Sequence, residues 1–485
     1  MKKLKYILCI LILGIYSCED FLNVQPVHNQ TIENTVTDYS GAKYIINGMY
    51  ASGTEIFQGG LMCALSSQAG VLKGGGSSSH YQMSYTTSSF DSYWSGWFGC
   101  VSSANAAIIA ISKLPENKFP SAEEKKRMIA EAKCFRAWTY AHFMWHFSHF
   151  WKDDEYGVLW REELGSVANM NSPRISVRES YNKIFADLDE AIAHLGDYTK
   201  ATRLSKQMAQ VLKAKLLLNR GWEGDYADAL DIVDDIIKNA PSHFAMNPDM
   251  KQMFTDAWDS NEVLWARYIE DGSRAYEEFS YSQSVIQGGY KFEHDTIVPN
   301  SLNSFYSEFN SWINADPRYD ATMGWARAVS ATGILYFCRS KLAREGRINM
   351  NDKWTTYYFR YPELYLLQAE LRARTGKTMA EAIAPINTMR SKRTYPVLPQ
   401  IATPSSEAEF MDILFKEYCL EFYAENGSDW LASRRILKNG APWFKAMKPD
   451  VDNDQFDENF WCWPIPATEI TLNTAMIQNP GNFNE

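Results

Sequence analysis

The chain has 485 residues, of which 46% are hydrophobic and 22% charged, and its 48 Lys and Arg against 58 Asp and Glu give a formal net charge of −10. This is the composition of a folded globular protein, and it excludes a disordered, collagen-like or small disulfide-dense chain. Because the chain is acidic and its basic residues are scattered, we expect no nucleic-acid partner. Its 16 Trp and 27 Tyr are large amphipathic rings, which serve cores and carbohydrate or peptide faces alike.

The first 17 residues have the pattern of a bacterial export signal. Three lysines within residues 2–5 precede an apolar stretch from Tyr6 to Tyr16. That stretch is too short to cross a bilayer, because a spanning helix needs roughly 20 residues. Ser17 and Cys18 follow, and a small residue before a cysteine at this place resembles a lipoprotein cleavage box. We therefore predict a signal peptide over 1–17 and a mature chain that begins at a lipidated Cys18, with a formal charge of −13 once the three lysines are lost.

Four later stretches follow a helical period, namely 123–150, 176–238, 361–393 and 407–440. In the second stretch the apolar residues Val177, Tyr181, Ile184 and Leu188 recur three or four positions apart. The helix pair over 205–238 is as long as one tetratricopeptide repeat, and glycines mark the turn between its two helices. Such pairs bury their apolar faces only by stacking, so we predict a mostly α-helical scaffold of tetratricopeptide type.

Two long stretches, 51–93 and 270–356, do not follow that period. The first is rich in Gly, Ser and Tyr, and the second mixes Gly, Asn and aromatic residues with weak alternation. Both are longer than ordinary connections, and long irregular insertions usually carry function. We expect them to form a loop-rich capping region that faces a ligand.

Several segments, in chain order, resemble the SusD/RagB family of outer-membrane lipoproteins. They are CEDFLNVQP (18–26), SANAAI (103–108), AEAKCFRAWTY (130–140), FRYPELYLLQAE (359–370), WPIPATE (463–469) and QNPG (478–481). The resemblance spans 18–485, and the C-terminal signature is its most specific part. The stretch HFSHFWK (146–152) departs from the family's usual Gly-containing turn, and Gly481 is followed by Asn and Phe where the family has Tyr.

The resemblance implies a SusD-like fold, with a helical scaffold and an irregular capping region over 18–485. It also implies a nutrient-binding lipoprotein that acts as the hinged lid of a SusC-like TonB-dependent transporter. The implied ligand is an oligosaccharide bound without turnover, with peptides as the alternative cargo of RagB-type members, and we expect no cofactor. Glu19 and Asp20 resemble the acidic export signal of such lipoproteins, which implies a lipid-anchored protein on the extracellular side of the outer membrane.

Aromatic residues of the two irregular stretches are candidate ligand platforms. A sugar packs its C–H face on Trp or Tyr rings while neighbouring polar side chains bind its hydroxyls, and glycan-binding members of the family do so. The candidate platform residues are Tyr81, Tyr85, Tyr290, Phe292, Trp312 and Trp325, with Phe90, Tyr276 and Tyr281 as further rings of the same stretches. Any one such ring is more often a packing residue than a platform, and for Trp94 we expect packing.

Histidines and acids give weaker signals. His142, His146 and His149 lie at i, i+4 and i+7, but only the first two share a helix face and no acid completes a zinc motif, so we expect packed histidines and no metal site. A lipid-anchored glycoside hydrolase stays open as an alternative, because its two carboxylates need no fixed spacing in sequence. The groups that we expect to be structural are the ion pairs Glu131–Arg136 and Glu417–Arg434 and the buried thiols of Cys134 and Cys419.

Overall fold

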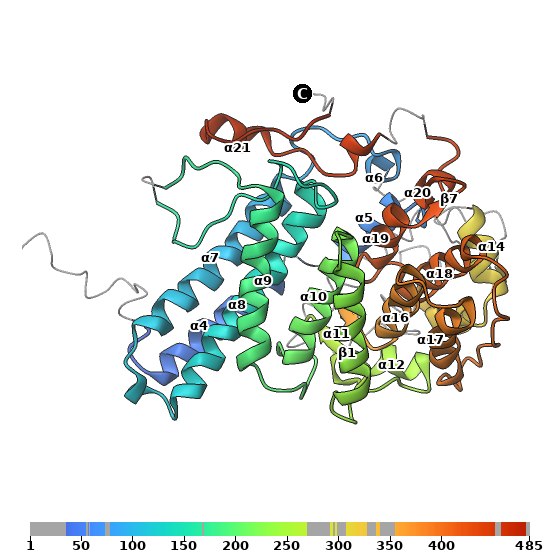
Figure 1. The fold of residues 1–485 in the computed structure, drawn as a ribbon, viewed down its shortest axis with the longest axis horizontal. Helices are drawn as coiled ribbons and strands as arrows, with labels where there is room; N and C mark the ends of the chain where they lie inside the picture. Colours follow the sequence, from blue (N-terminus) through green and yellow to red (C-terminus); the bar gives the residue numbers. More distant parts are fainter. Residues whose placement is uncertain are drawn as a thin grey trace, which may run out of the picture.

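A computed structural model describes residues 35–54, 57, 59–72, 78–166, 169–268, 292–293, 296–297, 307–326, 336–339, 355–451 and 457–481. About 60% of it is helical and strands are few, which confirms the predicted mostly α-helical class (Figure 1). The predicted signal peptide and Cys18 lie outside the described residues.

Helices and short strands follow one another along the chain. Their order is α4 (Tyr39–Thr54), α5 (Gly59–Gln68), α6 (Ser78–Gln82), α7 (Asp91–Lys113), η1 (Glu116–Lys118), α8 (Ala122–Phe147), α9 (Val177–His194), α10 (Lys206–Arg220), α11 (Asp225–Asn239), α12 (Met250–Asp256), η2 (Ala257–Asp259), β1 (Val263–Ala266), β2 (Phe292–Glu293), β3 (Thr296–Ile297), α14 (Ser307–Ala315), α15 (Arg318–Thr322), β4 (Met323–Ala326), β5 (Tyr336–Arg339), β6 (Tyr357–Arg360), α16 (Pro362–Arg374), α17 (Met379–Ser391), α18 (Glu407–Phe422), α19 (Ser428–Arg435), β7 (Leu437–Lys438), β8 (Ala441–Pro442), α20 (Trp443–Ala446), η5 (Glu458–Phe460) and α21 (Ala467–Leu472).

The scaffold is a continuous array of neighbouring helices. Each of α7, α8, α9, α10 and α11 packs against the next, α11 packs against α16, and α16 packs against both α17 and α18. Figure 1 shows α4, α7, α8 and α9 on the left, α10 and α11 in the middle, and α16 to α18 on the right. By length and composition α7 could cross a membrane, but its apolar residues pack against α4 and α8 in the core.

Serine or threonine starts several of these helices. In each case the side-chain oxygen accepts a hydrogen bond from the backbone N–H three residues later, which satisfies a donor that the first helical turn leaves without a partner. The capping residues are Ser121 for α8, Ser176 for α9, Ser205 for α10, Thr378 for α17 and Ser406 for α18. These caps fix the helix starts close to the positions expected from sequence.

The second half of α8 is buried on all sides. Every residue from Cys134 to Phe147 is buried, among them His142 and His146. A helix that is apolar all round lies in a core, whereas the charged first half of α8 lies at the surface. The imidazole of His146 stacks on the Trp463 ring with centroids 4.6 Å apart, and burial lowers the pKa of His142 to about 3. Both histidines are therefore neutral packing residues.

The C-terminal end of α8 is buried as well, and its last four carbonyls take their hydrogen bonds from elsewhere in the chain. Helix ends leave these carbonyls without intrahelical partners. The donors are Ser148 Oγ to Met144 O (2.8 Å), Arg434 Nη1 to Trp145 O (2.9 Å), Trp463 N to His146 O (2.5 Å), and Arg174 Nη2 and Asn479 Nδ2 to Phe147 O (2.9 and 3.0 Å). The C-terminal signature is thus part of the core.

The residues of both ion pairs expected from sequence have other partners. Arg136 binds Asp187 of α9 through two hydrogen bonds of 2.7 and 2.8 Å, while Glu131 accepts from Tyr50. Glu131 and Arg136 are five positions apart, so they do not share one face of α8. Arg434 donates to backbone carbonyls, and Glu417 pairs with Arg318 and Arg390. The prediction that these groups are structural holds, but the pairings were wrong.

The first irregular stretch is more helical than expected. Its described part contains α5 and α6, and α7 begins inside it at Asp91. The described part of the second stretch contains short elements, namely α14, α15 and the hairpins β2–β3 and β4–β5. Its two ends meet where β1 pairs antiparallel with β6, for example Val263 with Arg360. Cys134 and Cys419 are buried free thiols, as predicted.

Replacing Asn479 by alanine tests the role of the C-terminal segment. The change removes the hydrogen bonds from Asn479 to Phe147 O and Trp463 O, so two buried carbonyl oxygens each lose a donor. We therefore expect the free energy of unfolding to fall by about 2 kcal/mol. The exposed Asn239→Ala is the control, with an expected change within about 0.5 kcal/mol. Urea denaturation measures both. Equal changes in the two variants would contradict a core role for the C-terminal segment.

Candidate functional site

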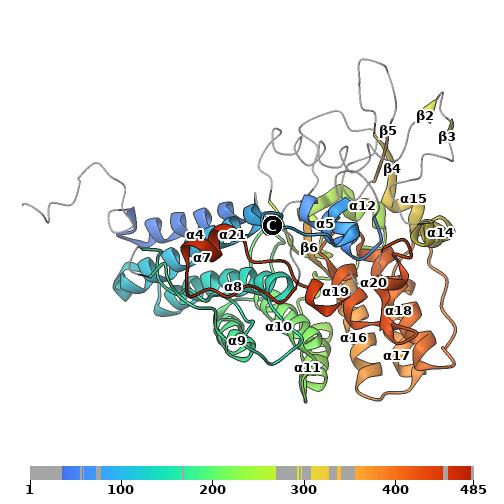
Figure 2. The same cartoon turned by 90° about the horizontal axis from the view of Figure 1, so that it is seen from above.

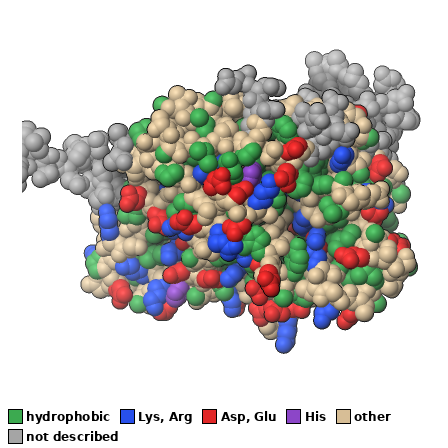
Figure 3. Space-filling view, turned by 45° about the horizontal axis from the view of Figure 1, so that its top comes forward, with side chains coloured by type: hydrophobic (Ala, Val, Ile, Leu, Met, Phe, Trp, Pro, Cys, Tyr) green, Lys and Arg blue, Asp and Glu red, His purple; other side chains and the backbone are tan. Residues whose placement is uncertain are grey.

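One side of the molecule carries the described elements of the second irregular stretch. In Figure 2, α15 and the hairpins β2–β3 and β4–β5 project on the side opposite α9, α11 and α17. The elements α12, η2, the end of β1, α14, α15 and these two hairpins form one surface, which we call the ligand face. In Figure 3, acidic and basic side chains are interspersed over the coloured surface.

The structure contradicts a platform role for Tyr81 and Tyr85. Both are buried, and the Tyr81 hydroxyl donates to Asp450 Oδ1 at 2.6 Å while that of Tyr85 accepts from the Gln68 amide. Phe90 is buried too and stacks on Trp463 with centroids 4.0 Å apart and ring planes 3° from parallel. All three rings are therefore packing residues of the protein interior.

Trp312 lies on α14 and is half-buried. Its ring packs edge-on against Trp443 at 5.8 Å and Phe415 at 6.4 Å, and Lys416 Nζ lies 5.1 Å from its centroid. The exposed part of the ring keeps it a candidate. Phe292 and Trp325 lie on β2 and β4 of the same face. Tyr276, Tyr281 and Tyr290 lie outside the described residues.

An aromatic pair on this face was not found from the sequence. Trp258 of η2 and Tyr268, two residues after β1, pack edge to face with centroids 5.5 Å apart. Tyr268 is 47% exposed, and Trp258 is partly buried against a small core of α12, β1 and α15. The irregular stretch predicted from the sequence begins at residue 270, two positions after Tyr268, and so does not contain it. The sequence feature that could have indicated this ring is an aromatic residue directly after a short apolar run.

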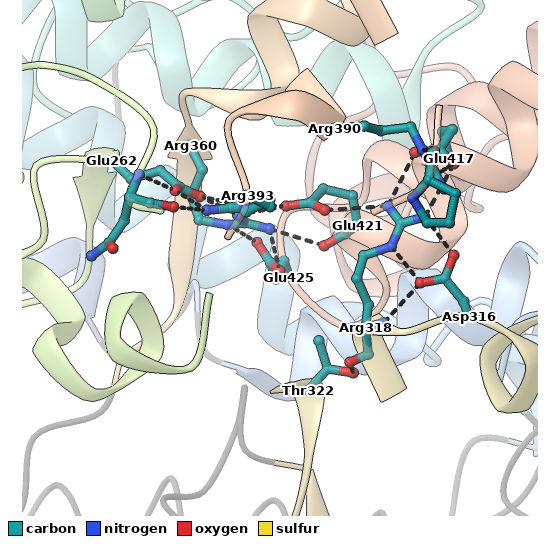
Figure 4. A network of polar contacts seen from close by, with 12 residues as sticks. Glu262, Asp316, Arg318, Thr322, Arg360, Arg390, Arg393, Glu417, Glu421 and Glu425 are labelled. Atoms are coloured by element: carbon teal, nitrogen blue, oxygen red, sulfur yellow. Dashed lines mark hydrogen bonds and ion pairs between the residues drawn. The ribbon is translucent and has the colours of Figure 1, made fainter. Parts of the chain in front are cut away.

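A buried ion network holds the ligand face on α18 (Figure 4). Arg318 of α15 binds Asp316 at 2.8 and 2.9 Å and reaches Glu417 at 3.1 Å and Glu421 at 3.3 Å. Burial alone would raise the pKa of Asp316, but the charge and hydrogen bonds of Arg318 outweigh it and hold that pKa below its usual value. The Arg318 guanidinium is fully buried, and Glu417 and Asp316 keep it charged.

The same network continues to the strands from which the second stretch emerges. Arg360 of β6 binds Glu425 at 2.7 and 2.9 Å and Glu262 at 2.6 Å. Arg393 joins Glu262 to Glu421, at 2.5 and 3.1 Å. Each of these carboxylates is thus bound to arginine.

Acid weakens the contact between Asp316 and Arg318. Because the folded-state pKa of Asp316 is depressed, its contribution to stability is present above the unfolded value of 3.8 and is lost as the pH falls below it. We expect Asp316→Asn to lower the free energy of unfolding at pH 7 by about 3 kcal/mol and by less at pH 3. Urea titrations at both pH values measure the difference, with the exposed Asp189→Asn as control. A difference that stays constant from pH 7 to pH 3 would contradict this account.

Comparisons with known proteins agree with this architecture. Residues 330–481 match the family model of the SusD family, and residues 20–218 match a family model described as "Starch-binding associating with outer membrane". No curated protein matches the chain.

Solved structures share the fold at low identity. A SusD superfamily protein from Bacteroides thetaiotaomicron is 19% identical with a TM-score of 0.69, over 91% of this chain and 99% of its own. A laminarin-binding SusD-like protein is 18% identical with a TM-score of 0.67, over 92% and 100%. Surface glycan-binding protein A from Bacteroides fluxus is 20% identical with a TM-score of 0.68, over 92% and 100%. With the two family models in chain order and this common fold, the chain belongs to the SusD/RagB family.

Proposed function

We propose that this protein binds an oligosaccharide at the ligand face without cleaving it. The observation that carries the proposal is the exposed Tyr268 ring, held edge to face against Trp258 on that face. Sugars offer C–H faces that pack on such rings, and a ring already fixed by a neighbour loses little freedom when a ligand arrives. Related folds described as laminarin-binding and surface glycan-binding support the same ligand class.

The protein delivers this ligand to a SusC-like TonB-dependent transporter, whose lid it forms. It is anchored in the outer membrane through a lipid on Cys18 and faces the cell exterior. The family description "associating with outer membrane" supports the location. The sequence supports the tether, because Ser17 and Cys18 directly follow the apolar stretch from Tyr6 to Tyr16.

Alanine at Tyr268 tests the ligand site. The probe is the oligosaccharide bound best by the mature protein on a glycan microarray, and isothermal calorimetry measures its affinity. We expect a loss of about 1–3 kcal/mol, which is roughly a 5- to 150-fold rise in Kd. Tyr44→Ala is the matched control, since Tyr44 of α4 is 69% exposed but lies outside the ligand face. Tyr81→Phe keeps a buried ring and should also bind normally. Unchanged affinity in Tyr268→Ala would place the site elsewhere.

The lipid anchor has a direct chemical test. Cells that express the wild-type chain should incorporate labelled palmitate into it, and cells that express Cys18→Ala should not, because the acyl acceptor is gone. Detergent partitioning of both proteins provides a second reading of the same change. Palmitate that still labels the Cys18→Ala chain would refute lipidation at Cys18.

A further inference from the structure

Arg318 occupies the junction between the ligand face and the scaffold. It begins α15, its side chain is fully buried, and its guanidinium reaches back to Asp316 and across to Glu417 and Glu421 of α18 (Figure 4). Five N–H donors in a rigid plane make such divided contacts possible, and a lysine ammonium cannot reproduce them.

Short connections lead from Arg318 to the rings of the ligand face. The Thr322 hydroxyl donates to the Arg318 carbonyl at 2.8 Å, and Thr322 is the last residue of α15 before β4, which carries Trp325. On its other side α15 packs against α12, where Ala321 shares a small core with Met253 and Phe254. Trp258 packs against that same core. The position of α15 therefore determines where β4 and the Trp258–Tyr268 pair lie.

The ring contacts between α14 and the α18 region constrain the position of α15 less sharply than the ion network does. The ring contacts here include Phe309 of α14 against Tyr423, the residue after α18, with centroids 5.4 Å apart, and Trp312 of α14 against Phe415 of α18. The Tyr423 hydroxyl also donates a long hydrogen bond of 3.4 Å to Thr322 O. Ring contacts of this kind tolerate small shifts, whereas hydrogen bonds weaken steeply as their geometry departs from the optimum. The ion network thus sets the register of α15 on α18.

We propose that Arg318 is a positioning residue for ligand binding, whose guanidinium fixes α15, and with it β4 and the Trp258–Tyr268 pair, relative to α18. This inference rests on the proposed glycan-binding function. Arg318 does not touch the ligand. It acts by holding the rings in one arrangement, so that ligand binding does not lose free energy to ordering these side chains.

The test compares Arg318→Lys with Arg136→Lys. Arg136 is a matched control, because it is also buried and makes two hydrogen bonds to one carboxylate, but it joins α8 to α9 within the scaffold. We expect both variants to lower the urea midpoint by similar amounts. We expect Arg318→Lys to weaken binding of the microarray-selected oligosaccharide at least tenfold and Arg136→Lys less than twofold. Equal losses of affinity would overturn the proposal.

Hydrogen exchange gives a reading that needs no ligand. Arg318→Lys should raise exchange over 307–326 and 250–268 more than elsewhere, whereas Arg136→Lys should raise it over α8 and α9. If the wild-type protein binds no glycan, the proposed function fails, and exchange alone then decides whether Arg318 fixes these segments. Exchange raised evenly over the chain in Arg318→Lys would overturn the positioning role.

A milder variant covers the case in which Arg318→Lys does not fold. Glu417→Gln keeps the side-chain shape and removes one of the charges that Arg318 binds. We expect a three- to fivefold loss of affinity and raised exchange over the same two segments. Unchanged affinity together with unchanged exchange would overturn the proposal.

Discussion

The buried C-terminal end of α8 is the constraint on which the rest of the fold depends. Leaving its carbonyls unpaired in a core would cost about 1–3 kcal/mol each, so distant parts of the chain must supply donors. Two of the donors, Arg174 and Arg434, have no carboxylate partner among the described residues, and burial lowers their pKa values to about 10 and about 9. The negative end of the helix dipole offsets part of their charge. The C-terminal segment therefore has to close over the scaffold.

The ion network around Arg318 and Arg360 holds the second irregular stretch on the scaffold. The second irregular stretch leaves the scaffold at β1 and returns at β6, and α15 and α18 are joined by buried charges. Burying such charges is costly, and apolar residues would often serve stability as well. What the network adds is a defined geometry for α15 and for the strands β1 and β6, where the insertion begins and ends. Scaffold and ligand face are thus held by separate means.

Much of the scaffold could be predicted from the sequence, because the positions of its helices follow from the local spacing of apolar residues. Helical periodicity places α8, α10, α11 and α18 to within a few residues. The ligand face could not be placed in the same way. Tyr81 and Tyr268 are both tyrosines in irregular sequence, and only tertiary packing makes one buried and the other exposed. The partners of Arg136 and Glu417 likewise come from helices far away in the chain, which no local spacing indicates.

The central claim is that the ligand face binds a glycan and releases it unchanged. A glycan microarray with the mature chain, followed by product analysis of the best ligand after prolonged incubation, tests it most directly. We expect binding to one family of oligosaccharides and recovery of the intact ligand. Release of shorter sugars would contradict binding without turnover, and a protein that binds no glycan but does bind peptides would contradict the ligand class.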